Sequence, residues 1–247
     1  MSLGLERPRE YDVTYLGASG DGHLGGINLS TSAYVALGEA NRGVFVDRAE
    51  KIRAGFIAAE LSKDFSWIRA RASLAWASGD DDPFDARGEG FDAIFENPLF
   101  AGADTSFWIR QPVPLIGGGR VALSGRNGLL NSLRPSKEFG QSNFVNPGLR
   151  LAGVGVDLDL TPTLRVSGNL NYLAFDDTAV LEVARAQEGI DREIGLDASI
   201  AVIWRPLAIQ NVVARLSVAS LLPGTGYRAL YGDETAYSVL GNLVLTY

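Results

Sequence analysis

Arginine side chains on an alternating segment are the residues of this sequence that could do chemistry. Between positions 68 and 76 every second residue is apolar, and Arg69 and Arg71 stand between them. A period of two predicts a β-strand with one apolar and one polar face. Unpaired charges are very costly in a dry core, so this strand fits a water-filled interior better than a sandwich core. Guanidinium groups facing such water would attract carboxylates and lower the electrostatic barrier to anions.

Later segments repeat this alternation and complete a predicted pore lining. They cover residues 149–160, 164–175, 193–204 and 211–222, and each carries polar side chains opposite a row of apolar ones. The predicted pore-lining residues are Arg69, Arg71, Asp157, Asp159, Arg165, Asn169, Asp197 and Arg215. Since aspartates share this face with the arginines, each arginine either attracts passing anions or forms a structural ion pair. The sequence leaves both roles open.

The last segment, residues 236–247, has the length and pattern of a strand that crosses a bilayer. Tyr237 and Tyr247 stand at the two ends of one mostly apolar face. A stripe of about ten residues with aromatic ends suits a tilted transmembrane strand. The chain is 46% hydrophobic, yet it has no apolar run of about 18 residues, the length that would predict a transmembrane helix.

Connections between the expected strands alternate between short and long. The long ones fall at about 80–104, 129–147, 176–192 and 223–235, with turns of a few residues between them. Outer-membrane barrels have short periplasmic turns and long extracellular loops. We therefore predict an all-β fold, an antiparallel transmembrane β-barrel with about eleven strands, as a single domain over residues 1–247.

The odd strand number favours a piece of a larger barrel. Single-chain bacterial barrels have an even number of strands, and the first residues show no signal peptide. The chain is therefore expected to be the C-terminal part of a larger even-stranded barrel, without its N-terminal strands and signal peptide. A strand missed in the count is the alternative. Residues 51–63 are also ambiguous, since their composition allows a helix while the short link to the next strand favours a hairpin.

Motifs for catalysis or cofactor binding are weak. Residues 20–25 match the dinucleotide pattern G-x-G-x-x-G, but residues 27–37 alternate like a strand, so a hairpin is expected and no cofactor. His23 is the only histidine and stands within this glycine-rich stretch. Barrel hydrolases need a nucleophile with a base, usually histidine, so we predict no catalytic residues and no enzyme.

An acidic run is the candidate for a metal site. The weak calcium candidates are Asp80, Asp81, Asp82 and Asp85. They lack the spacing of an EF-hand loop, so a solvated acidic loop is favoured over calcium, and no metal site is predicted. The net charge of −7 argues against a nucleic-acid partner. The absence of cysteine excludes a disulfide framework and a thiolate metal site.

Several motifs are similar to those of a known family. They are WASGDDDPFD, GFDAIFENPLFAG, GQSNFVNPGL, DLTPTLR and NYLAF, and the similarity runs from about Tyr11 to Tyr247. On these motifs the chain resembles the bacterial alginate-export-like outer-membrane proteins. The resemblance implies a β-barrel channel in the bacterial outer membrane. The founding member of that family exports an anionic polysaccharide through an arginine-rich pore, whereas the lining predicted here mixes arginine with aspartate.

The expected function is a porin-like outer-membrane channel for passive passage or export of a hydrophilic solute, an anionic saccharide or polysaccharide among the candidates. Its partners would be outer-membrane lipid and that solute. The alternative is a structural or scaffold barrel that binds a partner through its loops, which a narrow, side-chain-plugged lumen would favour. A soluble β-sandwich is a further alternative, and it would need a second sheet over the outward faces.

Overall fold

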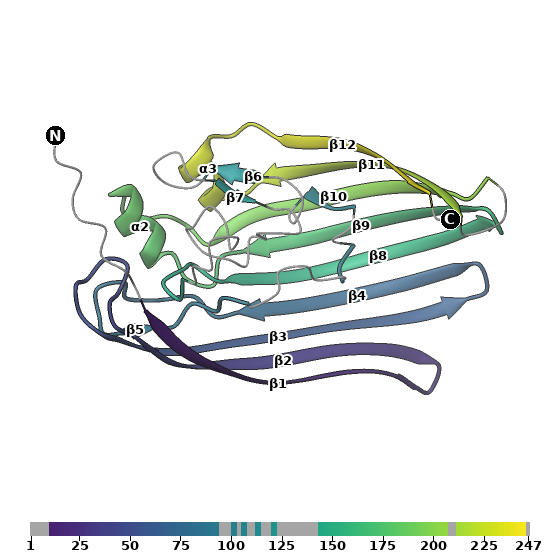
Figure 1. The fold of residues 1–247 in the computed structure, drawn as a ribbon. Helices are drawn as coiled ribbons and strands as arrows, with labels where there is room; N and C mark the ends of the chain where they lie inside the picture. Colours follow the sequence, from purple (N-terminus) through teal and green to yellow (C-terminus); the bar gives the residue numbers. More distant parts are fainter. Residues whose placement is uncertain are drawn as a thin grey trace.

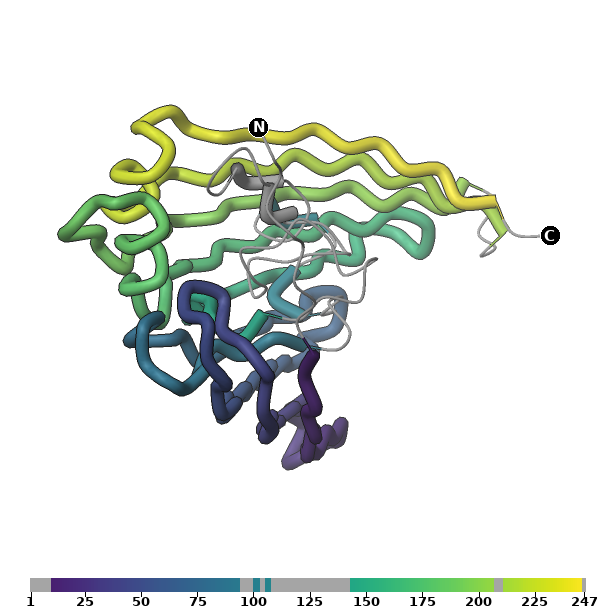
Figure 2. The backbone as a smooth tube through the Cα atoms, turned by 60° about the vertical axis from the view of Figure 1, so that its left-hand side comes forward, coloured from purple at the N-terminus to yellow at the C-terminus, as the bar shows by residue number. Residues whose placement is uncertain are grey.

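A single curved sheet dominates the computed structural model of this protein, which describes residues 10–93, 100–102, 105–107, 143–206 and 211–245, with backbone alone at 112–114 and 120–122. The sheet has ten strands and bends around a concave face (Figures 1 and 2). Its long strands are all antiparallel to their neighbours, in the order β1-β2-β3-β4-β8-β9-β10-β11-β12. Their bounds are β1 (Tyr11–Leu24), β2 (Ile27–Ala40), β3 (Glu50–Phe65), β4 (Ile68–Ala77), β8 (Leu149–Thr161), β9 (Leu164–Ala174), β10 (Glu193–Trp204), β11 (Val212–Pro223) and β12 (Ala236–Leu245).

The remaining elements are short. Strand β5 (Arg87–Gly88) pairs in parallel with β3, and β6 (Pro112–Pro114) pairs with β7 (Arg120–Ala122) in a separate two-stranded sheet. Helices α2 (Ala179–Arg185) and α3 (Thr225–Tyr231) lie in the long connections. In the described part of the chain, every helix is too short or too polar to cross a membrane.

Short turns gather at one end of the sheet and long connections at the other (Figure 1). The β1–β2 hairpin turns at Gly25 and Gly26, whose φ angles of 57° and 81° are those of a type I′ turn. The β3–β4 and β8–β9 hairpins also turn within two residues. Residues 51–63, whose composition also allowed a helix, form part of strand β3. Two of the predicted short turns, β3–β4 and β8–β9, and the long connections that carry α2 and α3 are thus present. The predicted turns at 117–119 and near Arg205 lie partly outside the described residues.

The G-x-G-x-x-G motif lies within a hairpin, as predicted. Residues 20–24 are the end of β1, and β2 follows directly, with His23 exposed and opposite Asn28. A dinucleotide site would need a helix at this position, with the pyrophosphate at its N-terminus. The strand that stands there excludes that use of the motif.

The convex face of the sheet is apolar on every long strand. The strand registers place one exposed aliphatic side chain after another across this face. Examples from each strand in turn are Leu16, Val35, Ile57, Leu74, Val154, Leu170, Ile200, Val218 and Val239, between 44% and 65% exposed. An apolar surface of this extent is unusual for a protein in water.

Aromatic side chains border the apolar band at both ends. Toward the short turns lie exposed Phe65, Trp67 and Trp204, and toward the long connections lie exposed Trp76 and Tyr172. Tyr172 is level with Leu196 on β10, eight residues from Trp204. At about 3.4 Å per residue the two aromatic levels are about 27 Å apart along the strand. Aromatic girdles at a similar separation flank the lipid-facing band of outer-membrane barrels.

The strand count differs from the prediction. The main sheet has ten strands, one of them the short β5, where about eleven strands were expected. The predicted strands at 105–116 and 120–128 do not enter it, because β4 pairs directly with β8. Pro112 and Pro114 lack the N–H that a central ladder needs, which accounts for β6 pairing only with β7. The other residues of those two predicted strands lie largely outside the described residues.

The sheet is open in the described part of the chain. Strands β1 and β12 are its two edges and are not paired with each other there. Both run in the same direction, because an even number of antiparallel steps separates them. The expectation that the sheet belongs to a larger, even-stranded barrel therefore stays a prediction. So does Tyr247 as the terminal aromatic, since residues 246 and 247 lie outside the described residues.

One side chain points opposite to its predicted direction. The alternation predicted for residues 193–204 puts Ile194 with Leu196 on the outward face, opposite Asp197, but Ile194 is 1% exposed and belongs to the core. The register of β10 against β9 shifts between Glu193 and Gly195, which inserts a bulge. Gly195 has a φ of 136° and its Cα lies so close to Leu222 that no side chain would fit. The bulge turns Ile194 inward.

The concave face is covered, near the long connections, by residues of the β4–β8 connection. Phe91 stacks on Phe56 of β3 with ring centroids 5.2 Å apart and meets Tyr15 of β1 edge-on at 6.3 Å. The Tyr15 hydroxyl donates to the Asp92 carbonyl at 2.6 Å. Phe107 and Phe144, from the same connection, are also buried. The main core of the molecule therefore lies between the sheet and this connection.

Candidate functional site

The registers place all the predicted lining residues on the concave face. Arg69 is opposite Asp157, Arg71 opposite Gly155, Asp159 opposite Arg165, Asn169 opposite Ser199, Asp197 opposite Asn171, and Arg215 opposite Ile203. From the short turns toward the long connections the lining changes from charged pairs to uncharged polar groups and then to the apolar core. The strands thus combine an apolar convex face with a polar concave one.

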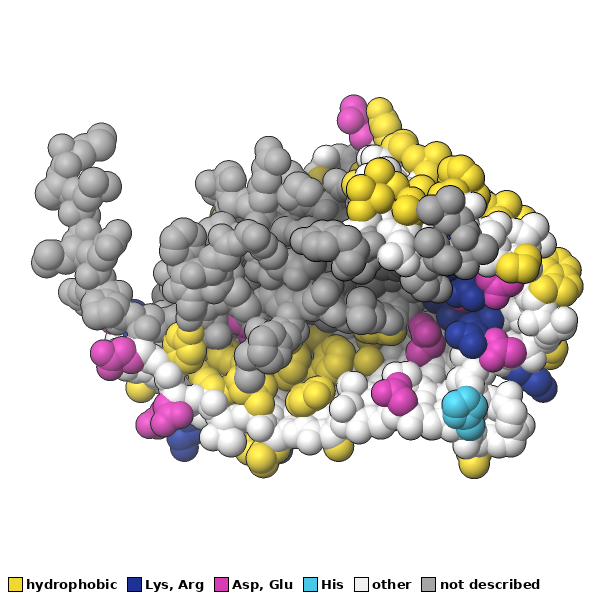
Figure 3. Space-filling model, turned by 45° about the vertical axis from the view of Figure 1, so that its right-hand side comes forward, with side chains coloured by type: hydrophobic (Ala, Val, Ile, Leu, Met, Phe, Trp, Pro, Cys, Tyr) yellow, Lys and Arg dark blue, Asp and Glu magenta, His cyan; other side chains and the backbone are white. Residues whose placement is uncertain are grey.

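Two arginines near the short turns form exposed ion pairs. Arg69 contacts both carboxylate oxygens of Asp64, at 2.6 Å and 3.0 Å. Arg165 does the same with Asp159, at 2.6 Å and 2.8 Å. Basic and acidic side chains lie side by side at this end (Figure 3). Because these pairs are exposed, water screens the attraction within each pair and it contributes little to stability.

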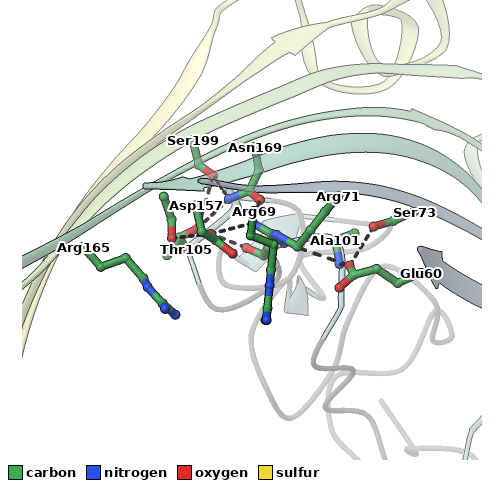
Figure 4. A network of polar contacts seen from close by, with 12 residues as sticks. Glu60, Arg69, Arg71, Ser73, Ala101, Thr105, Asp157, Arg165, Asn169 and Ser199 are labelled. Atoms are coloured by element: carbon green, nitrogen blue, oxygen red, sulfur yellow. Dashed lines mark hydrogen bonds and ion pairs between the residues drawn. The ribbon is translucent and has the colours of Figure 1, made fainter. Parts of the chain in front are cut away.

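Arg71 forms a more enclosed network, with only 12% of its side chain exposed. Its Nη2 donates to Asp157 Oδ1 at 3.1 Å and to Asn169 Oδ1 at 2.7 Å, and its Nη1 is 4.0 Å from Glu60 Oε2 (Figure 4). Ser167 donates to the same Asp157 oxygen at 2.6 Å. Two carboxylates thus surround one guanidinium, which removes most of its attraction for a free anion.

Glu60 joins this wall to the inward-folded connection. Its Oε2 accepts hydrogen bonds from the Ser73 hydroxyl at 2.7 Å and from the Ala101 N–H at 2.8 Å. Asn171 donates from the wall to the Ala101 carbonyl at 2.9 Å. The peptide groups on both sides of Ala101 are therefore held by two strands, β3 and β9.

Thr105 and Ser106 are held by hydroxyl and amide groups of β9 and β10. The Ser199 hydroxyl lies 3.3 Å from that of Thr105 and 3.2 Å from that of Ser106. Asn169 donates to the Thr105 hydroxyl at 3.1 Å. Thr105, Ser106, Asn169 and Ser199 are all at most 8% exposed. Residues 100–107, as far as they are described, are thus bound to the wall by polar contacts rather than by apolar packing alone.

Two glycines of β8 make room for this network. A Cβ at Gly153 would lie 2.0 Å from Asn171 Oδ1, and one at Gly155 would lie 2.8 Å from Asn169 Oδ1 and 2.9 Å from Arg71 Nη2. No side chain fits at either position without displacing these groups. Gly153 and Gly155, which alternate with Val154 and Val156, therefore leave the space on the concave face that the Asn169 and Asn171 side chains occupy.

Sequence comparison identifies no relative. No family model matches the chain, and no curated protein matches it. The resemblance to alginate-export-like proteins therefore remains a prediction from the motifs alone.

Sequence reasoning found the arginines but missed their partners Glu60 and Asp64. Both lie on β3, whose alternation could not be fixed from the sequence because Phe56, Ile57 and two alanines put apolar residues on both faces. Asn171 and Ser199 were seen as inward-facing, without a role. Arg215 lies on the concave face opposite Ile203 and Asn242.

The acidic run does not gather into a calcium site. Asp82 accepts from the Phe84 N–H at 3.0 Å, while Asp85 accepts from the Arg87 N–H at 2.6 Å and pairs with the Arg87 guanidinium at 2.7 Å. Asp80, by contrast, is 1% exposed and accepts from the Glu89 N–H at 3.1 Å. Among the residues described, no three His, Cys, Asp or Glu side chains are grouped as metal ligands would be. The geometry gives calcium no support.

Proposed function

We propose that this protein is a porin-like β-barrel channel of the bacterial outer membrane that passes a hydrophilic solute. The observation that carries the proposal is the division of every long strand into an exposed apolar convex face and a polar concave face. In water the convex face would be a large aggregation-prone patch, whereas in a bilayer it is solvated by lipid. Long strands of ten to sixteen residues exceed the length of about nine residues that a tilted transmembrane strand needs.

The concave face indicates the class of solute. Exposed ion pairs at Arg69 and Arg165 line the end near the short turns. Amides and hydroxyls follow, together with the enclosed Arg71 network and the buried Asp197. Such a surface offers both hydrogen-bond donors and acceptors and carries little net charge, which suits polar and saccharide-like solutes. Anionic solutes would gain only where an arginine leaves its aspartate, so we expect a weak preference for anions.

Ion selectivity tests the proposal. In planar bilayers the purified protein should give discrete conductance steps. Arg69→Gln with Arg165→Gln should leave Asp64 and Asp159 unpaired and shift the permeability ratio several-fold toward cations, whereas Asp64→Asn with Asp159→Asn should shift it toward anions. Arg87→Gln, which breaks a similar exposed pair on the short strand β5, should change neither. Absence of conductance steps from folded protein would contradict the channel.

A structural or scaffold barrel is the second candidate, and one observation favours it. Residues 91–93, 100–102 and 105–107 cover part of the concave face, through Phe91, Ala101 and Thr105. If this cover is permanent, the barrel would serve as a platform whose long connections bind a partner. Folded, membrane-inserted protein that never conducts would support the scaffold.

A further inference from the structure

A built polar site on the concave wall is occupied by the chain itself. Its wall groups are Glu60, Ser73, Asn169, Asn171 and Ser199, which come from strands β3, β4, β9 and β10. Its occupant is a short stretch that offers one peptide N–H and one C=O at Ala101 and two hydroxyls at Thr105 and Ser106. Figure 4 shows four of these wall groups directed at Ala101 and Thr105: Glu60, Ser73, Asn169 and Ser199.

The chemistry of the contacts points to hydroxyl recognition. The wall contacts two neighbouring hydroxyls with an amide and a hydroxyl, and a carboxylate accepts beside them. Amide, hydroxyl and carboxylate side chains can each pair with a group that both donates and accepts, as a sugar hydroxyl does. A chain of sugar hydroxyls presents the same donor and acceptor functions.

The site also has polar atoms that make no hydrogen bond with the plugging residues or with the wall. In the described part of the chain, Asn171 Oδ1 and Arg71 Nε are buried without a hydrogen-bond partner. Asn171 is 1% exposed, and an unmet polar atom at such a site costs free energy. One atom needs a donor and the other an acceptor, and hydroxyl groups supply both.

We infer that these wall groups form a binding site for polyhydroxylated solutes, and that residues 100–102 and 105–107 occupy it as an autoinhibitory plug. This inference rests on the proposed channel function. In the plugged state Thr105 and Ser106 take the place of solute hydroxyls. A solute that competes for Asn169, Asn171 and Ser199 displaces the plug and opens its own passage. Glu60, which holds the Ala101 N–H without contacting the hydroxyls of Thr105 or Ser106, acts as the latch.

A reversible lock tests the inference. The chain has no native cysteine, and the hydroxyl oxygens of Ser106 and Ser199 are 3.2 Å apart, close enough for a disulfide between cysteines at these positions. Ser106→Cys with Ser199→Cys is oxidised with diamide, reduced with dithiothreitol, and studied in planar bilayers. Mass spectrometry measures how much disulfide forms. We expect a conductance several-fold lower in the oxidised state than in the reduced state, and Ser106→Cys alone should show no such difference.

A second variant tests the latch and the solute. Glu60→Gln should raise the open fraction several-fold, since the neutral amide holds the Ala101 N–H more weakly than a carboxylate. Maltohexaose, a neutral oligosaccharide, should open the wild type and then transiently block its current, and Asn171→Ala should weaken both effects several-fold. Arg87→Gln, outside the site on the short strand β5, should leave the response to maltohexaose unchanged.

The outcomes separate the inference from the channel proposal. Equal conductance of the fully disulfide-bonded and reduced forms would overturn the plug while leaving the channel in place. Conductance that responds to the lock but not to maltohexaose would overturn the hydroxyl site. No conductance from any folded variant would overturn the channel and, with it, this inference.

Discussion

Single residues on the concave face act through their neighbours. The guanidinium of Arg71 lies between Glu60 and Asp157, and its position depends on Asn169 as well. Replacing either carboxylate would leave a partly buried charge with fewer partners, which costs more than the pair itself contributes. The sequence could place Arg71 and Asp157 on one face, because both strands alternate clearly. It could not pair them, because pairing depends on the register between β4 and β8, which are 71 residues apart in the chain.

Asp80 makes a residue-scale prediction about pH. Burial, with a smaller contribution from the nearby Asp85 and Glu50 carboxylates, raises the pKa of Asp80 from 3.8 to about 7. The folded protein therefore binds this proton more tightly than the unfolded chain. The stabilisation is complete below pH 3.8 and is lost as the pH rises through about 7.

We expect the free energy of unfolding to fall by about 3 kcal/mol between pH 5 and pH 8, at about 1.4 kcal/mol for each pKa unit. Asp80→Asn should remove most of this slope, and Asp82→Asn, at an exposed position, should keep it. Urea unfolding in detergent across this range measures the slope. A wild-type protein that gains stability as the pH rises would contradict the assignment.

At the scale of elements, the alternation of apolar and polar residues predicted reliably which face of a strand each side chain occupies. Arg69, Asn169 and Asp197 lie on the predicted face because each strand repeats every two residues without interruption around them. Ile194 was placed wrongly because a bulge at Gly195 breaks that repeat, and bulges leave little trace in a hydrophobic pattern. The strands predicted around Pro112 and Arg120 are present in part as β6 and β7, but they pair only with each other, because proline lacks the N–H that a central ladder needs.

The glycines of β8 give an element-scale prediction. Gly153→Ala would place its Cβ 2.0 Å from Asn171 Oδ1, so Asn171 must move and lose its bond to Ala101. Overpacking of this kind costs about 1–3 kcal/mol, and the plug should also be released. Urea unfolding and open fraction in bilayers measure the two effects. Gly168→Ala on β9, whose nearest contact would be an ordinary 3.7 Å, is the matched control. Equal behaviour of both variants would contradict the account.

At the scale of the molecule, the account depends on which solvent each face of the sheet meets. The apolar band, the aromatic levels at Trp204 and Tyr172, and the separation of short turns from long connections all agree with a barrel wall in a bilayer. The two-residue repeat of the sequence predicted the strands. The number of strands and the closure of the barrel depend on pairings between strands, which no local pattern encodes. The open edges at β1 and β12 are the clearest example.

Site-directed quenching is the measurement that tests this central claim most directly. Single cysteines in the cysteine-free chain, labelled with a small fluorophore, are placed at the outward positions Leu170, Ile200 and Val218 and at the inward positions Arg69 and Arg165. The protein is then reconstituted into vesicles with brominated lipid. The account predicts strong quenching at all three outward positions, and weak quenching at the inward ones, which iodide in the water should quench instead. Equal quenching by lipid on both faces, or quenching by iodide alone on the outward face, would contradict it.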